Sequence, residues 1–150
     1  MKKIILSLII LLNFSCSNND NVENFQSQDI LPALIGKGEL SGDENIIQQN
    51  TVVTNQVQWN QLINDMNSIN NISNTFTETN VDFNNYIIIV SIDLVRPNTG
   101  YSININSIVE NENNITIDIQ NVNHNGGFSS IIQPYHIVKI PIQNKPIIFE

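Results

Sequence analysis

Alternation of isoleucine with polar residues, repeated in the second half of the chain, restricts the sequence to a β-rich fold. Residues 101–105 and 115–119 each place an apolar side chain at every second position. Successive side chains of a strand point to opposite faces of a sheet, so both segments are predicted to be half-buried strands. Residues 110–114 are the predicted turn between them.

The segment Tyr86–Val95 is almost continuously apolar. Such a run is typical of a central strand that is covered on both faces. Shorter segments rich in apolar and β-branched residues predict further strands at 35–41, 46–54, 135–142 and 146–149. Because Ser41–Glu44 contains turn-forming residues, we expect it to join the first two of these strands in a hairpin.

One amphipathic helix is predicted between the strands. Its apolar residues recur at a spacing of three to four and are Trp59, Leu62, Ile63, Met66 and Ile69. Asn55, followed three residues later by Gln58, is a predicted capping box, and Trp59 is expected in the core. The predicted fold class is therefore α+β, a mainly antiparallel β sheet or sandwich with one amphipathic helix in a single domain.

The first residues have the layout of an export signal. Lys2 and Lys3 precede the apolar run Ile4–Leu12, and the small residue Ser15 stands directly before Cys16. The apolar run is much shorter than the ~20 residues that a membrane-spanning helix needs. We therefore expect a cleavable signal peptide over residues 1–15.

Residues 12–16 resemble the lipobox of bacterial lipoproteins, in which the cysteine is acylated and becomes the new N-terminus. This resemblance implies a lipid on Cys16 and a place at the cell envelope, on the outer membrane. Residues 17–29 are polar and lack periodicity, so we expect a flexible tether over 16–30 before a folded domain over 31–150. The alternative is an ordinary signal peptide with an incidental cysteine.

Cysteine usage and charge indicate how the domain is stabilised and which partners it disfavours. Cys16 is the only cysteine, so the mature domain is expected to have no internal disulfide and to depend on its core for stability. The formal net charge is −8, and the two N-terminal lysines leave with the signal peptide. Such an acidic chain argues against nucleic acid and against anionic lipid as partners.

Nothing in the sequence indicates a catalytic apparatus. The only thiol is expected to carry lipid, and no Gly-x-Ser-x-Gly motif marks a serine nucleophile. His124 and His136, the only histidines, share no metal-ligand spacing with each other or with an acidic cluster. We therefore expect no catalytic residue, no metal site and no cofactor.

Several motifs of the folded part match one known family. They are Val81–Phe83, Arg96–Ile103, Gln133–Ile140, the Ser41-Gly42 turn and Trp59. Through these motifs, over roughly residues 36–149, the chain resembles the protease complex subunit PrcB family, whose C-terminal domain occurs in bacterial lipoproteins. The resemblance implies a non-enzymatic accessory subunit that binds a secreted or surface protease.

A second likeness concerns two loops. Arg96–Tyr101 is similar to the Asn-Pro-Thr-Thr-Gly-Tyr/Phe loop of chagasin-type inhibitors of cysteine peptidases, and His124–Gly127 stands where those proteins have a glycine-rich loop. This likeness implies the alternative function of a protease inhibitor. Their third loop has no counterpart here, and Arg96 replaces their asparagine. A structural envelope lipoprotein without a protease partner is a further alternative.

The candidate partner-binding residues are Arg96, Pro97, Asn98, Thr99, Gly100 and Tyr101, then Gly126, Gly127 and Phe128, and finally Tyr135 and His136. Residues 96–100 have the composition of a tight hairpin loop, in which Gly100 accepts a positive φ. Arg96 and Tyr101 flank that turn, and both residue types are common interface anchors. Alanine at both is expected to abolish partner binding and to leave thermal stability nearly unchanged.

Each of these segments also has a purely structural interpretation. The first is then a turn without further role, and the loop that contains Phe128, which we expect to be exposed, is a flexible connection. Tyr135 and His136 begin a strand and point in opposite directions, so one is expected to pack inside while the other faces out.

Overall fold

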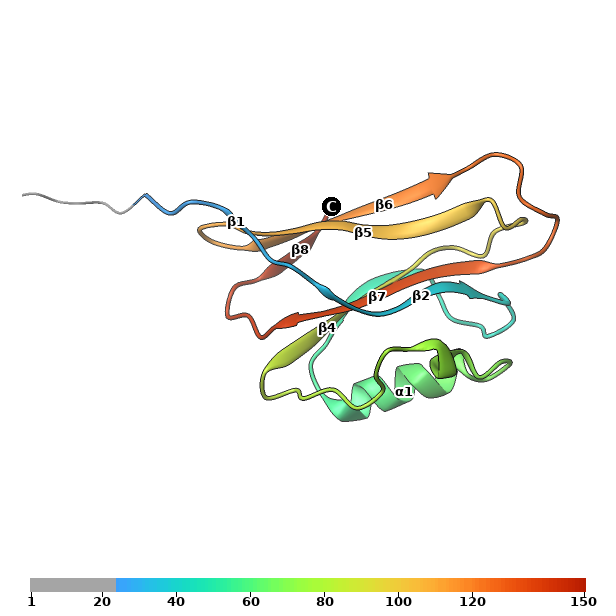
Figure 1. Ribbon diagram of the computed structural model, residues 1–150, viewed down its shortest axis with the longest axis horizontal. Helices are drawn as coiled ribbons and strands as arrows, with labels where there is room; N and C mark the ends of the chain where they lie inside the picture. Colours follow the sequence, from blue (N-terminus) through green and yellow to red (C-terminus); the bar gives the residue numbers. More distant parts are fainter. Residues whose placement is uncertain (1–23) are drawn as a thin grey trace, which may run out of the picture.

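The computed structural model describes residues 24–150, which form two four-stranded sheets and one α-helix (Figure 1). Cys16 and the predicted signal peptide lie outside the described residues. The sheet that we call the outer sheet has the order β1 (Gln28–Asp29), β5 (Tyr101–Glu110), β6 (Ile115–Asn123) and β8 (Ile147–Phe149). The central sheet has the order β2 (Ala33–Leu40), β7 (Gln133–Pro141), β4 (Tyr86–Ile92) and β3 (Gln49–Val53).

The elements stack in three layers, with the central sheet between the outer sheet and helix α1 (Gln56–Met66) (Figure 1). Alternate residues of β4 pack into two hydrophobic cores, one on each face of the central sheet. Ile88, Val90 and Ile92 pack with Trp59 and Met66 of α1, whereas Ile87 and Ile89 pack against isoleucines of β5 and β6. This double coverage explains why β4 is apolar at consecutive positions, and the predicted α+β fold with a mainly antiparallel sheet and one helix is confirmed.

The start of α1 is built as its sequence predicts. The Asn55 side chain accepts a hydrogen bond from the backbone N–H of Gln58 at 3.0 Å. The Gln58 side chain reaches back one residue further than in the usual capping box and accepts from the backbone N–H of Thr54 at 3.2 Å. Trp59 is fully buried and donates from Nε1 to the carbonyl of Thr79 at 2.9 Å, so its predicted place in the core is confirmed.

The predicted hairpin of the first two long strands is wrong. β2 pairs with β7 and β3 pairs with β4, so two other strands separate β2 from β3. The turn at Ser41–Glu44 exists, because the carboxylate of buried Glu44 accepts from the backbone N–H groups of Ser41 and Gly42. Local turn chemistry was therefore readable from the sequence, but the partners of the flanking strands were not.

Two boundaries and one connection also differ from the sequence-based prediction. β4 ends at Ile92 rather than at Val95, and the helix ends at Met66, which leaves Ile69 beyond it with 53% exposure. β4 and β5 belong to different sheets, so residues 96–100 lie in a connection between sheets and not in a hairpin loop. The last short strand, β8, runs parallel to β6. In residues 24–150, no helix has the length and apolar character required to cross a bilayer.

Candidate protein-binding site

Arg96 is held against the interior by a buried carboxylate. Asp93, which directly follows β4, has 0% exposure, and its carboxylate accepts from Arg96 Nε at 2.7 Å and from Nη2 at 2.9 Å. This bidentate contact raises the pKa of Arg96 above its ordinary value. The guanidinium also lies 4.9 Å from the centroid of the Tyr101 ring. Alanine at Arg96 would leave Asp93 unpaired, so we expect it to destabilise the fold, in contrast to the expectation from sequence.

The two candidate loops are hydrogen-bonded to each other. The backbone N–H of Thr99 donates to the carbonyl of Phe128 at 3.1 Å, and the N–H of Phe128 donates to the Thr99 hydroxyl at 3.0 Å. The N–H of His124 donates to the carbonyl of Gly100 at 2.8 Å. Residues far apart in the sequence therefore form one paired structure, which we call the loop pair (residues 96–100 and 124–128).

Glycine is required in the loop pair because the two backbones touch. A Cβ atom added to Gly127 would lie 2.0 Å from the backbone nitrogen of Gly100, far inside any allowed contact. Gly126 has a φ of +107°, whereas Gly100 is not among the positive-φ residues. The predicted positive φ at Gly100 is thus wrong, and the physical reason for glycine there is the close approach of Gly127.

The remaining residues of the first loop have local roles. The side chain of Asn98 accepts from the backbone N–H of Gly100 at 2.9 Å, which closes the turn. Arg96 and Ile132 exchange backbone hydrogen bonds of 2.7 and 3.0 Å, and these tie the base of the loop to the start of β7. Pro97 is exposed and Tyr101 is half-buried beneath Arg96.

Large apolar side chains that are exposed to solvent lie in the loop pair and in segments next to it. Val95 and Ile131 both adjoin Gly42, since a Cβ atom there would lie 3.0 Å from each of them. Leu94 and Val95 also line a cleft together with Ile47. The loop-end surface, as we name it, consists of Ile47 (77% exposed), Leu94 (50%), Val95 (48%), Phe128 (86%) and Ile131 (62%). Exposed apolar residues that gather in this way are typical of a binding surface.

The floor of that cleft contains a buried polar group. Gln133 is 1% exposed, and its Nε2 donates to the carbonyls of Ile46 at 2.8 Å and Asp93 at 2.9 Å. Its Oε1 is buried and has no hydrogen-bond partner among residues 24–150. A buried acceptor without a partner costs free energy in the folded chain.

Tyr135 and His136 lie away from the loop-end surface. Tyr135 is 2% exposed and packs in the core beneath α1, where burial raises the pKa of its hydroxyl. His136 is half-buried between the sheets, and its Nδ1 accepts from the backbone N–H of Ile105 at 2.8 Å. Burial, followed by the nearby Lys37, lowers the pKa of His136 to about 4. The neutral imidazole thus joins β7 to β5 across the two sheets, and the prediction that one of these two side chains faces out is wrong.

Sequence reasoning found the loops but missed their apolar surroundings. Asp93 and Leu94 were assigned to a strand because the apolar run continues to Val95. The carboxylate at position 93 was the available signal, since a charge inside an apolar run ends the run or needs a buried partner. Within residues 24–150, no three His, Cys, Asp or Glu residues group as metal ligands would.

Comparisons with protein-family models, with curated proteins and with solved structures find no match for this chain.

Proposed function

We propose that this chain is a non-enzymatic accessory subunit that is anchored to the cell envelope by lipid on Cys16 and binds a protein partner through the loop-end surface. A secreted or surface protease is the partner class that the family resemblance favours. The anchor rests on the lipobox-like residues 12–16, and the binding role rests on the exposed apolar side chains around the loop pair.

The exposed apolar cluster is the observation that carries the proposal. Its members come from separate parts of the chain, and the loop pair holds two of the segments together through backbone hydrogen bonds. A surface that is already ordered loses little conformational entropy on association, which favours binding. Phe128, the one aromatic residue among the five of this surface, suits a partner pocket, because aromatic residues are frequent interface anchors.

Co-purification from the native envelope tests the proposal. The variant Leu94→Ser/Phe128→Ser/Ile131→Ser removes apolar surface at exposed positions, so its thermal stability should stay close to that of the native chain. We expect the partner to be recovered with the native chain and lost with this variant. Leu31→Ser is the matched control, because Leu31 is 87% exposed and follows Ile30, which bonds to Ile108 near the opposite end of β5.

The outcomes separate the parts of the proposal. Equal recovery of the same protein with the triple variant and the native chain would show that the loop-end surface does not bind that protein. A Cys16→Ser chain that stays in the membrane fraction would contradict the proposed lipid anchor on Cys16. Inhibition of a papain-like peptidase by the purified full chain would favour the inhibitor alternative over the accessory subunit.

A further inference from the structure

The outer edge of β3 leaves backbone hydrogen-bonding groups free. The N–H of Asp93 donates to the carbonyl of Pro134 in β7. Backbone N–H and C=O groups of successive residues in a strand point to opposite sides, so those of Ile88, Val90 and Ile92 point towards β3. Their partners are Val53, Thr51 and Gln49. Asn50 and Val52 therefore point their N–H and C=O groups away from the sheet, and these groups have no hydrogen-bond partner in residues 24–150.

The opposite edge of the central sheet, β2, is protected. The segment after η1 (Ile72–Thr75) covers β2, because the N–H and hydroxyl of Thr77 donate to the carbonyls of Ile35 and Leu34. β2 also has a bulge and a lysine, which are common devices against unwanted pairing. β3 is Gln-Asn-Thr-Val-Val, without lysine, proline, glycine or a bulge. Its edge remains open to another strand.

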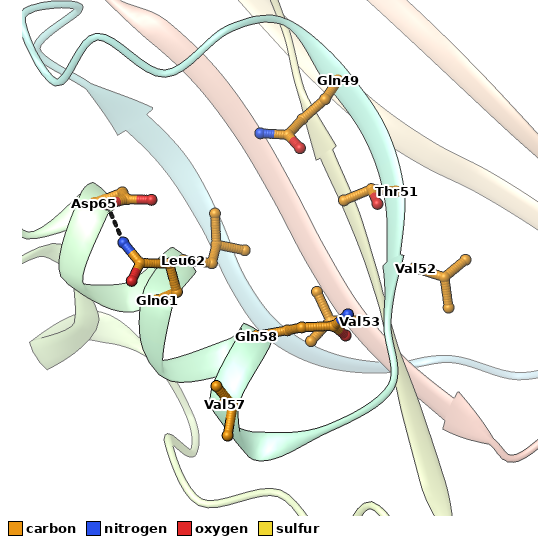
Figure 2. A pocket seen from close by; sticks show the side chains of 9 residues that line it. All are labelled: Gln49, Thr51, Val52, Val53, Val57, Gln58, Gln61, Leu62 and Asp65. Atoms are coloured by element: carbon orange, nitrogen blue, oxygen red, sulfur yellow. Dashed lines mark hydrogen bonds between the residues drawn. The ribbon is translucent and has the colours of Figure 1, made fainter.

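A groove runs beside this open edge, between β3 and α1 (Figure 2). Its volume is about 500 Å³, and its apolar lining includes Val53, Val57 and Leu62. Figure 2 shows Gln58 and Gln61 on the helix side of the groove and Gln49 and Thr51 on the strand side. A neighbouring cleft shares Gln49, Leu62 and Asp65 with the groove and extends it towards Ile46 and Ile47.

The charge around the groove is negative. Asp65 lines both the groove and its extension, and no lysine or arginine lines either of them. Each basic side chain of residues 24–150 already contacts a group within the chain: Lys37, Arg96, Lys139 and Lys145. Basic side chains on a ligand would therefore be attracted to this face, and acidic ones would be repelled.

We propose that the groove between β3 and α1 binds an extended polypeptide segment that adds to the free edge of β3 as a further strand. Backbone groups of the segment would pair with Asn50 and Val52. Alternate apolar side chains would occupy the groove over Val53 and Leu62, and basic side chains would be favoured near Asp65. The groove itself shares no residue with the loop-end surface, and only its extension reaches that surface, at Ile47. The proposal does not depend on the role of that surface.

Titration of the purified full chain with a synthetic peptide tests the site. The probe is a blocked nine-residue peptide of alternating valine and lysine, and its matched control alternates valine and glutamate. We expect the first peptide to bind and the second to bind at least about tenfold more weakly. In the complex, amide hydrogen exchange of Asn50 and Val52 should slow, because both N–H groups become bonded to the peptide.

Backbone methylation of the probe distinguishes strand addition from charge attraction alone. One version is N-methylated on its valines and another on its lysines, and only one of these sets can face β3. We expect one version to bind about tenfold more weakly and the other to keep its affinity. Equal affinity of both versions with the unmodified peptide would overturn the proposal.

A matched pair of protein variants tests the same backbone hydrogen bonds by changing β3 instead of the peptide. Asn50→Pro removes the outward N–H, while Asn50→Ala keeps it, and both lose the contact of the Asn50 side chain with Ser91. Only the proline variant should lose affinity. The Leu94→Ser/Phe128→Ser/Ile131→Ser variant should bind the peptide normally, so the two proposals can fail separately. Protected Asn50 and Val52 amides in a dimer of the free chain, or no peptide binding at millimolar concentration, would overturn the proposal.

Discussion

At the scale of single residues, buried polar side chains fix the geometry of this fold. Asp93 is fully buried and turns Arg96 inward, so a side chain that sequence alone presents as an interface anchor instead secures the connection between two sheets. His136 joins the same two sheets through the backbone of Ile105. Breaking either contact would leave a polar group buried without a partner, which costs more than the contact itself contributes.

Protonation of His136 makes the fold sensitive to acid. Its pKa of about 4 in the folded chain lies below the ordinary value of 6.5, so the unfolded chain takes up the proton first as the pH falls. The stabilisation is fully present above pH 6.5 and is lost as the pH falls from there to about 4. The loss is expected to be on the order of 3 kcal/mol.

Urea unfolding at several pH values from 7.5 down to about 4 measures this loss. The control is His136→Gln, whose amide oxygen accepts a hydrogen bond but does not titrate. The difference between the two chains removes the contribution of the carboxylates, which titrate in both. A variant that loses as much stability as the native chain over this interval would contradict the role given to His136.

At the scale of elements, the loop pair joins two connections that are remote in sequence. Gly127→Ala is expected to force the loops apart, because the new Cβ atom meets backbone atoms at 2.0 to 2.7 Å. Gly100→Ala should cost less, since its nearest contacts are the Asn98 side chain at 2.9 Å and the Gly127 nitrogen at 3.1 Å.

Urea midpoints should therefore rank native, Gly100→Ala and Gly127→Ala in order of decreasing stability, with Gly127→Ala losing about 1–3 kcal/mol. Amide exchange at Thr99, whose N–H bonds to Phe128, should accelerate in Gly127→Ala. Equal midpoints for the two variants, or the reverse order, would contradict the close contact of the two glycines.

At the scale of the whole molecule, local patterns predicted the elements better than their arrangement. The alternating isoleucines of β5 and β6, the continuous apolar run of β4 and the Asn55 cap were readable because each depends on neighbours in sequence. The pairing of β2 with β7 could not be predicted from the sequence, because it joins residues about one hundred positions apart.

The candidate site shows the same division. The loops of the loop pair were predicted from their glycines, and Phe128 is exposed as expected. The surrounding Ile47, Leu94 and Ile131 were not recognised, since an apolar residue in a sequence does not reveal whether a sheet covers it. These side chains come together at one end of the molecule only when the chain folds.

Site-specific cross-linking in the native envelope tests the central claim, that the loop-end surface binds a protein. A photoreactive phenylalanine analogue is placed at position 128 in one full-length chain and at position 31 in another, since Phe128 and Leu31 are 86% and 87% exposed. A discrete adduct with one protein is expected from position 128 and none from position 31. The absence of an adduct at position 128, or the same adduct from both positions, would contradict a binding role for the loop-end surface.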